Sequence, residues 1–413
     1  MRDALRICLV SSSLHAVPPR SHGAIESQMM EHARGLARAG HEVHVLTVGE
    51  EDGIVSDTLE GIRFHRLAEA YESRHRRRGI AGLARSQVRF GLRARRLCAH
   101  LEPDIVHWHS RYPCLLGPST GATRRARRAP RHVYHVHNWK LAERMPYPRL
   151  SPRRAAAILG AGIDRRVAQN CDRVVAISEF IRDRVLATSR VPASRISIVT
   201  NVVDVDLFRP DPREANRSGI LFVGRIAAEK GVAPLIEGMA AVARHSPQTT
   251  LSIVGPDQDG TERGSYMREC KTLVSRLGLE RNVRFAGAVP NRELPALLRR
   301  SQILAVPSVW GEPLGVVVLE GLACGIPVVA SRVGGIPELI EEGRTGLLVP
   351  PADPSALGRA LLSALHDDAL QERASTCGPD SVVRHHTWHA VRERLESIYR
   401  LTLEDARPSG SET

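Results

Sequence analysis

The chain has 413 residues, of which 42% are apolar and 25% charged, so its length and composition fit a two-domain globular protein and argue against collagen-like, coiled-coil or wholly disordered chains. Its formal net charge is +13. The first 210 residues carry 35 basic and 20 acidic side chains, whereas the remainder carries 23 and 25, so the positive excess belongs to the first half.

Neither a membrane span nor a secretion signal is expected. The sequence contains no run of about 18 apolar residues, and Arg6 interrupts the first apolar stretch. The seven cysteines lie far apart without a CxxC pair, which argues against a cysteine-based zinc site or a disulfide framework. We therefore expect a cytoplasmic protein in which most cysteines are buried.

Short apolar runs alternate with longer helical patterns along most of the chain. Several runs are continuous, as in strands of a parallel sheet that is buried on both faces. The first series of predicted strands covers residues 6–12, 42–48, 104–109, 132–137, 173–177 and 196–200. The second covers residues 219–224, 250–254, 283–286, 303–306, 327–330 and 346–349. The fold class is therefore α/β, with two doubly wound, Rossmann-like domains whose ligands lie at the carboxyl ends of the strands.

The domain boundaries follow from a polar, proline-containing stretch. Residues 204–218 fit neither a helical nor a strand period, so we interpret them as a linker. The first domain then covers residues 1–203 and the second covers 219–387. A helix at about 388–405 is expected to pack back on the first domain, and residues 407–413 are expected to be disordered.

The loop after the first predicted strand contains Gly23, which opens a helical pattern. A glycine at such a position lets backbone N–H groups approach a phosphate. Further along, residues 74–96 have a helical period. Five arginines share one face of that helix, Arg78, Arg85, Arg89, Arg93 and Arg96, with the apolar residues Ile80, Leu83, Ala84, Val88 and Leu97 largely opposite. Such a helix either lies on an anionic membrane or packs on the core with a solvated basic face, and we favour the second interpretation.

Four histidines occur in pairs on two predicted strands. His107 and His109 share one face of their strand, and so do His135 and His137. Such a group suggests a metal site. However, no carboxylate or cysteine completes an obvious ligand set, so we predict that no metal is bound.

The second half carries a phosphate-binding pattern. Arg225 and Lys230 directly follow the strand at 219–224, so they should emerge at its carboxyl end. A short helix is predicted from Pro313, a residue suited to a first helical position, to Gly325, which suits a left-handed stop. The free N–H groups of Gly315 and Val316 would then form an anion site.

Glutamates stand on both sides of that anion site. Glu312 and Glu320 are eight residues apart, or roughly 12 Å along a helix axis. This spacing fits a long ligand with a polar sugar at each end and a diphosphate between them.

With these residues the sequence resembles the family-4 nucleotide-sugar glycosyltransferases of the GT-B fold. The resemblance rests on the glutamate-x7-glutamate motif, on the Arg225 and Lys230 pair, and on the segments 326–331 and 334–339. It runs over essentially the whole chain, most strongly over residues 219–351 and most weakly over about 50–100. The chain departs from the family pattern in having Ala24 after Gly23, where two glycines are usual, and Val202 after Asn201 in place of Asn-Gly.

The resemblance implies two domains that face each other across a cleft, with a role for each matching residue. Glu312 would hold the donor sugar and Glu320 the ribose, while Arg225 and Lys230 would neutralise the departing diphosphate. The positions expected to line the donor are Gly23, Gly255, Val289, Gly315 and Val316. His137 would contact the donor sugar near the scissile bond, and His109 and Asn138 are the candidates on the acceptor side.

The resemblance also implies the reaction. A sugar would pass with retained configuration from a nucleoside diphosphate, expected to be UDP, to an acceptor hydroxyl in a glycan, a glycolipid or a natural product. Neither a cofactor nor a metal would be required. The basic first half favours an anionic acceptor or peripheral contact with a membrane.

Other functions remain as alternatives. A GT-B phosphorylase or a sugar-nucleotide epimerase would share the architecture. A basic nucleic-acid-binding module is disfavoured, because no zinc-finger, RNP or helix-turn-helix signature occurs and no aromatic residues alternate with the arginines.

Overall fold

The computed structural model describes residues 4–12, 15–19, 23–49, 54–68, 79–115, 129–139, 152–214, 217–257 and 265–405. The chain divides into two compact units. Unit 1 consists of Met1–Val202 and Val391–Thr413, and unit 2 is Val203–Ala390. The predicted disordered tail at 407–413 lies outside the described residues.

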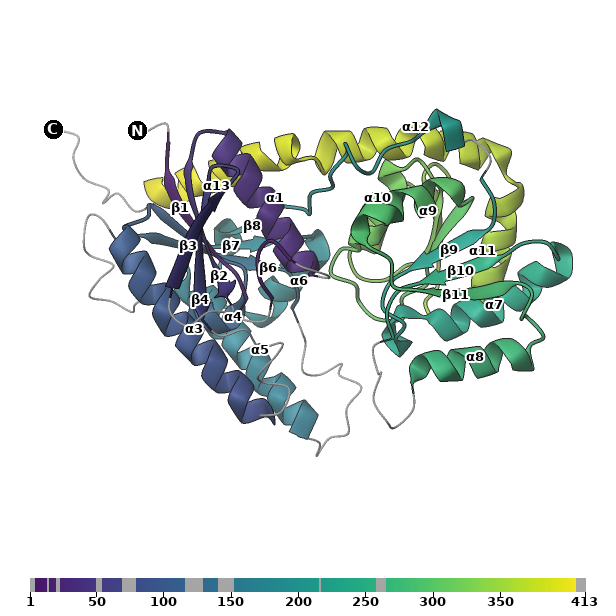
Figure 1. The fold of residues 1–413 in the computed structure, drawn as a ribbon, viewed down its shortest axis with the longest axis horizontal. Helices are drawn as coiled ribbons and strands as arrows, with labels where there is room; N and C mark the ends of the chain where they lie inside the picture. Colours follow the sequence, from purple (N-terminus) through teal and green to yellow (C-terminus); the bar gives the residue numbers. More distant parts are fainter. Residues whose placement is uncertain are drawn as a thin grey trace. The chain divides into compact units, whose positions relative to one another are not determined.

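Unit 1 is built around an eight-stranded sheet in the order β3-β4-β2-β1-β5-β6-β7-β8, in which β3 runs antiparallel to β4 and the other pairs are parallel (Figure 1). Its strands are β1 (Arg6–Val10), β2 (Glu42–Gly49), β3 (Ile54–Leu59), β4 (Ile62–Ala68), β5 (Ile105–Trp108), β6 (Arg131–Val136), β7 (Arg173–Ala176) and β8 (Ile196–Ile198). Its helices are α1 (Ala24–Arg38), α3 (Gly79–Leu101), α4 (Arg111–Leu115), α5 (Pro152–Asn170), α6 (Glu179–Thr188) and most of α13 (Trp388–Glu404).

Unit 2 contains a six-stranded parallel sheet in the order β11-β10-β9-β12-β13-β14. Its strands are β9 (Ile220–Val223), β10 (Leu251–Val254), β11 (Val283–Gly287), β12 (Ile303–Val306), β13 (Val328–Ser331) and β14 (Gly346–Val349). Its helices are α7 (Val232–His245), α8 (Tyr266–Arg276), α9 (Leu294–Arg300), α10 (Val316–Ala323), α11 (Pro354–His366) and α12 (Asp368–His385). Numbered along this unit, the strand order is the 3-2-1-4-5-6 of doubly wound folds.

The expected α/β fold is confirmed, and all twelve predicted strands are present. The sequence did not predict β3 and β4, because polar side chains interrupt their apolar runs. In β4, for example, Ile62 and Phe64 are buried whereas Arg63 between them is exposed. Where the linker was predicted, the described residues form a turn and the short 3-10 helix η4 (Pro212–Glu214).

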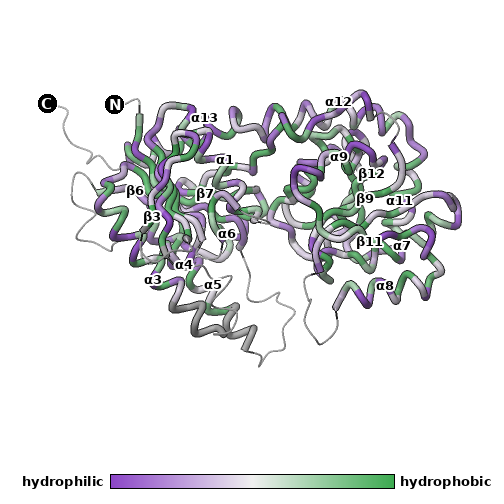
Figure 2. The backbone as a smooth tube through the Cα atoms, in the orientation of Figure 1, coloured by the Kyte–Doolittle hydropathy of each residue, from purple (hydrophilic) through white to green (hydrophobic). Residues whose placement is uncertain are grey.

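Apolar residues concentrate along the strands of both sheets, as the hydropathy colouring in Figure 2 shows. In unit 2 the buried cluster combines strand residues such as Phe222 and Ile253 with Ile236 of α7 and Leu361 of α11. Six of the seven cysteines are buried, which confirms that expectation. Because the core occupies the strands, the loops at the strand ends remain for function.

Helix α13 ends the described chain and packs within unit 1. The hydroxyl of Tyr399 lies 2.7 Å from Nδ1 of His107, near the end of β5. Arg173 of β7 donates to the carboxylate of Asp405 at 2.6 Å. The helix expected at 388–405 therefore packs on the first sheet, where it contacts β5, and Asp405 just beyond its end contacts β7.

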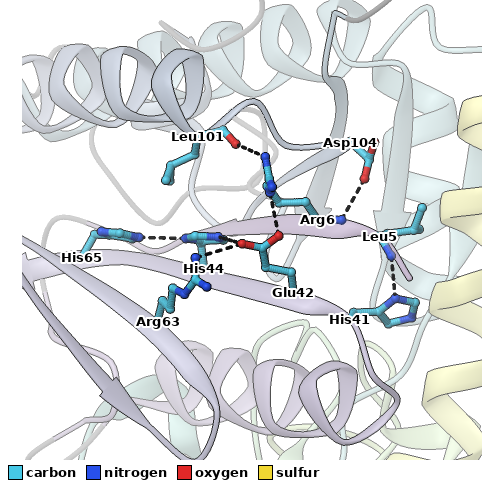
Figure 3. Close-up of polar contacts among 9 residues, drawn as sticks. All are labelled: Leu5, Arg6, His41, Glu42, His44, Arg63, His65, Leu101 and Asp104. Carbon is cyan, nitrogen blue, oxygen red and sulfur yellow. Dashed lines mark hydrogen bonds and ion pairs between the residues drawn. The ribbon is translucent and has the colours of Figure 1, made fainter. Parts of the chain in front are cut away.

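An ionic network joins three strands of unit 1 (Figure 3). Glu42 of β2 accepts a hydrogen bond from Arg6 of β1 at 2.8 Å and one from Arg63 of β4 at 2.9 Å. The bond from Arg6 lowers the pKa of the Glu42 carboxyl group. His44 lies 3.2 Å from the same carboxylate, and its Nδ1 is 2.9 Å from Nε2 of His65. Both ring nitrogens of His44 therefore have partners.

The basic helix α3 packs differently from the prediction. Its buried residues include Phe90, Ala94 and Cys98, whereas Val88 and Leu92 are 48% and 42% exposed. The prediction that Val88 packs on the core is thus wrong, and the polar residues Ser86 and Gln87 beside it are buried instead. Arg78 and the side chains of Ile80, Leu83, Ala84 and Arg85 lie outside the described residues. Within the described residues no helix is long and apolar enough to cross a bilayer, and membrane contact through α3 stays a prediction.

Candidate functional site

The candidate site of unit 2 lies at the switch point of its sheet, between β9 and β12. Ligands of doubly wound sheets bind at the carboxyl ends of the strands on either side of such a point. Lys230, in the 3-10 helix η5 (Ala228–Lys230), follows β9, and Glu312 follows β12. Nζ of Lys230 donates to Oε1 of Glu312. The topology thus brings together two residues that are 82 positions apart in the sequence.

Two further side chains hold the Glu312 carboxylate. Ser308 Oγ and Trp310 Nε1 each donate to its Oε1 at 3.1 Å. Glu312 is 7% exposed, and Nζ of Lys230 lies 5.7 Å from the centroid of the Trp310 ring. Charge-assisted hydrogen bonds of this kind fix the orientation of a buried carboxylate. Its Oε2 takes no part in these bonds.

Sequence reasoning did not select Ser308 or Trp310. Both belong to the connection that follows β12, directly at the switch point. A hydroxyl and an indole N–H just beyond a buried parallel strand are the signal that could have identified them, since such connections carry the functional groups of α/β folds.

The loops that carry Lys230 and Glu312 are locked together by their backbones. Gly231 adopts φ +73°, and a Cβ atom there would lie 1.9 Å from the carbonyl oxygen of Pro307. The N–H of Val309 donates to the carbonyl oxygen of Glu229 at 3.0 Å. The geometry of the Lys230–Glu312 pair is therefore set by main-chain contacts rather than by side-chain rotamers alone.

Two glycines support the backbone of Glu312 from another side. Gly334 has φ +61°, and a Cβ atom there would lie 1.9 Å from the Glu312 carbonyl oxygen. The N–H of Gly335 donates to that oxygen at 2.8 Å. The sequence segment 334–339 thus supports Glu312 through close contact between the two backbones.

The turns after β9, β10 and β11 stack on one another. Gly255 has φ +147°, and its Cβ position lies 1.8 Å from the carbonyl oxygen of Gly224, which immediately precedes Arg225. The N–H of Gly255 donates to Gly287 at 2.8 Å, two residues before Val289. Gly255 and Val289 therefore occur at the carboxyl ends of neighbouring strands, next to the turn that presents Arg225.

Helix α10 begins later than the sequence predicts. Its first residue is Val316, and its N-cap is Gly315 with φ +98°, so Pro313 is not a first helical residue. The left-handed Gly315 forces this later start, whereas Gly325 is left-handed with φ +70°, as expected. Because Glu312 precedes the helix, the 12 Å spacing along a helix axis does not apply. Glu320 lies in the second turn, and burial raises the pKa of its carboxyl group to about 7.

Unit 1 has its own switch point, between β1 and β5, and histidines gather beside it. His107 and His109 come from the end of β5, His135 and His137 from the end of β6, and His32 from α1. The rings of His135 and His137 stack with their centroids 4.4 Å apart, and those of His109 and His135 are 5.1 Å apart. His109 Nδ1 lies 3.0 Å from His137 Nε2.

These histidines are uncharged at neutral pH. Burial is the main cause, and repulsion between the rings adds to it; together they hold the pKa of His107, His109 and His135 well below the usual value. Burial also lowers the pKa of His137. Sequence reasoning missed His32, although it lies between Met29 and Leu36 on the buried side of α1, where a histidine marks a polar group that faces the core.

The remaining predicted residues of unit 1 lie at the start of α1 and just after β6. Gly23 is the N-cap of α1 with an extended backbone, φ −178°, so its conformation does not itself require glycine. A Cβ atom there would lie 2.7 Å from Oε2 of Glu26, whose other oxygen accepts from Ser12 at 2.8 Å. The start of α1 thus already holds a carboxylate, and phosphate binding at Gly23 stays a prediction. Asn138, half-buried, follows His137 directly after β6.

Two family descriptions match consecutive parts of the chain. "Glycosyltransferase Family 4" matches residues 25–207, and "Glycosyl transferases group 1" matches residues 206–380. The chain belongs to the family-4 glycosyltransferases. The second match contains both Lys230 and Glu312, so the cluster at the switch point of unit 2 lies within the shared part of the family.

Individual relatives agree with this assignment. The chain is 34% identical over 233 residues to the D-inositol 3-phosphate glycosyltransferase of Corynebacterium glutamicum, an alignment that covers 52% of this chain and 54% of the relative. It thus spans about half the length of the first curated relatives that it matches.

Solved structures share the fold. The sucrose-phosphate synthase of Thermosynechococcus elongatus has a TM-score of 0.78 at 21% identity, with 97% of this chain and 100% of that chain covered. Anabaena HepE in complex with UDP-glucose has a TM-score of 0.69 at 20% identity, with 96% and 100% covered. These similarities establish GT-B architecture for the chain.

Proposed function

We propose that the chain is a retaining glycosyltransferase that moves a sugar from a nucleoside diphosphate to an acceptor hydroxyl. The observation that carries the proposal is the Lys230–Glu312 pair at the switch point of unit 2, with Ser308 and Trp310 on the same carboxylate oxygen. Such a site offers a fixed acceptor atom for sugar hydroxyls and a cation for phosphate.

Each remaining residue of the site has a proposed role. Arg225 and Lys230 neutralise the diphosphate, and the N–H groups of Gly315 and Val316 at the start of α10 bind its oxygens. The turns at Gly255 and Val289 contact the nucleotide. The ribose hydroxyls donate to Glu320 on α10, and the proposed contact of His137 with the donor sugar completes the set.

The proposed transfer retains configuration and needs no protein nucleophile, cofactor or metal. The bond between the anomeric carbon and the diphosphate oxygen breaks, and the acceptor oxygen bonds to that carbon on the same face. The acceptor proton passes to the departing phosphate oxygen. Stabilising the negative charge of the leaving group is then the main contribution of the protein, which is what Arg225 and Lys230 can supply.

Relatives and charge suggest the substrates. HepE, which shares the fold, was solved with UDP-glucose, so we propose a UDP-sugar donor. The names of two relatives contain a phosphorylated compound, inositol 3-phosphate and sucrose phosphate. Because the first 210 residues hold 35 basic against 20 acidic side chains, an anionic acceptor is the corresponding proposal for this chain.

A donor screen tests the proposal before any acceptor is known. Thermal unfolding and slow hydrolysis would be measured with UDP-, GDP- and ADP-sugars, and one nucleotide is expected to raise Tm and to be hydrolysed. Glu312→Gln should reduce the hydrolysis, whereas Glu342→Gln, on the exposed pair with Arg332, should not. No stabilisation by any nucleotide sugar, or release of an epimerised donor without acceptor, would contradict the proposal.

A further inference from the structure

The histidine cluster of unit 1 contains a group of three nitrogen ligands that converge from three different elements. One ring nitrogen each from His32, His109 and His135 lies within 4.8 Å of the other two, and among the described residues this is the group with metal-ligand geometry. The three side chains are 1%, 3% and 1% exposed. They come from α1, from the end of β5 and from β6, so the fold rather than a local motif assembles them.

Unsatisfied nitrogens in this cluster indicate a missing ligand. Among the residues that the structure describes, both ring nitrogens of His135 and Nε2 of His109 are buried without a hydrogen-bond partner. A buried polar atom without a partner costs about 1–3 kcal/mol, and most such atoms in proteins are paired. Ordered water or a metal ion would supply the missing contacts.

The other nitrogen of His109 already has the partner that a metal ligand needs. Its Nδ1 lies 3.0 Å from Nε2 of His137, so a proton on Nδ1 leaves the lone pair of Nε2 free. Metal-bound histidines usually donate their second N–H to such an acceptor, which fixes the tautomer and the ring. His137 would then act on the site through His109.

The ligand set selects the class of ion. Three neutral imidazoles without a carboxylate suit zinc and its first-row neighbours rather than calcium or magnesium. Zinc–nitrogen bonds of about 2.0–2.1 Å place tetrahedral ligands about 3.3 Å apart, so the three nitrogens would have to converge by up to about 1.5 Å. A fourth position remains open, and His107 is a candidate for it, because its ring centroid lies 4.6 Å from that of His109 and its Nε2 has no hydrogen-bond partner among the described residues.

We propose that His32, His109 and His135 bind one divalent transition-metal ion, with zinc as the favoured species. The site lies beside the switch point of the first sheet and joins α1 to β5 and β6. It departs from the expectation of no bound metal that was drawn from the sequence. The proposed transfer reaction does not need this ion, although His137, the partner of His109, is also the proposed contact of the donor sugar.

Metal uptake by the full chain tests the proposal. The protein would be purified without a histidine tag, stripped with a chelator, incubated with zinc and desalted, and its metal content measured. About one retained zinc per chain is expected, with a rise in Tm that saturates at one equivalent. Cobalt in place of zinc should give the visible spectrum of a low-symmetry, four-coordinate site.

Variants locate the ion. His135→Gln and His32→Gln should each weaken zinc binding by about 100-fold or more, because each removes one of three ligands. His44→Gln is the matched control. His44 is also buried and stacked on another histidine in the same sheet, but its nitrogens are paired with Glu42 and His65, so its loss should leave zinc uptake unchanged.

Two results would overturn the proposal. One is wild-type protein that retains less than about 0.1 zinc per chain, in which case water fills the cluster. The other is equal uptake by wild type and by folded His135→Gln and His32→Gln proteins, which would assign the zinc to surface histidines. If circular dichroism shows that neither variant folds, the stoichiometry and cobalt spectrum of the wild type decide.

Discussion

The two sheets have switch points of the same topology but of opposite chemistry. Beside the switch point of unit 2, Lys230 and Glu312 form a charged pair, and two more side chains donate hydrogen bonds to the same carboxylate oxygen. Beside that of unit 1, neutral histidines stack on one another and several ring nitrogens lack partners. The same doubly wound arrangement therefore positions a preorganised charge in one unit and a group of neutral imidazole rings in the other.

Removing the cation of unit 2 should have the largest effect on activity. We expect Lys230→Ala to lower turnover by about 100-fold or more, because the leaving diphosphate and the buried Glu312 both lose their charge partner. Turnover would be measured with the donor identified by the screen. Lys271→Ala, a lysine on the exposed side of α8, is the control and should retain full activity. Comparable turnover in both variants would remove Lys230 from the site.

Disturbing the backbone behind Glu312 should cost stability. Gly334→Ala would place a methyl group 1.9 Å from the Glu312 carbonyl oxygen, so we expect a loss of about 3 kcal/mol or more in the free energy of unfolding. Gly343→Ala is the matched control, since φ is +75° there but nothing lies within 4 Å. It should cost about 1–2 kcal/mol. Equal losses in urea unfolding would show that the backbone contact at Gly334 is unimportant.

The raised pKa of the half-buried Glu320 carboxyl group predicts a pH dependence. Its folded-state pKa of about 7 lies above the unfolded value of 4.5, so the folded protein keeps a proton that the unfolded chain loses in between. Stability should therefore fall as the pH rises from about 4.5 to 7, by about 1–3 kcal/mol at 1.36 kcal/mol per pKa unit. Urea unfolding of wild type and Glu320→Gln across this range gives the difference. A difference that does not vary with pH would place the pKa near its ordinary value.

The smallest effect is expected at the exposed ion pair of the same region. Arg225 lies 3.4 Å from Glu229, four residues on, and its side chain is 47% exposed. Exposed pairs of this kind contribute about 0–1 kcal/mol, so Glu229→Ala should change the free energy of unfolding by less than about 1 kcal/mol. A larger loss would mean that Glu229 positions Arg225 in the way that Ser308 positions Glu312.

The sequence predicted the strands and the charged residues of unit 2 because both leave local signals. Continuous apolar runs mark buried parallel strands, and Lys230 and Glu312 each follow such a strand at a recognisable spacing. Two kinds of residue were harder to find. Ser308 and Trp310 contact a residue of their own loop but belong to no motif. His32 joins the histidine cluster only through the packing of α1.

Strand β4 was not predicted, and the packing face of α3 was predicted wrongly, for a related reason. Arg63 and His65 take part in the network around Glu42, so polar side chains interrupt a strand whose apolar residues are nonetheless buried. In α3 the predicted apolar position Val88 is exposed, whereas Gln87 beside it is 4% exposed. Single-residue hydropathy does not show which polar side chains are buried.

The backbone lock between Gly231 and Pro307 has a consequence for engineering. The two connections that carry Lys230 and Glu312 touch through main-chain atoms, so neither can change length without displacing the other. Exchanging one of them for the corresponding loop of a relative should therefore misplace the pair, even where the new loop keeps its charged residue. Residues 224–231 and 307–312 should therefore be exchanged together in any attempt to alter the choice of donor.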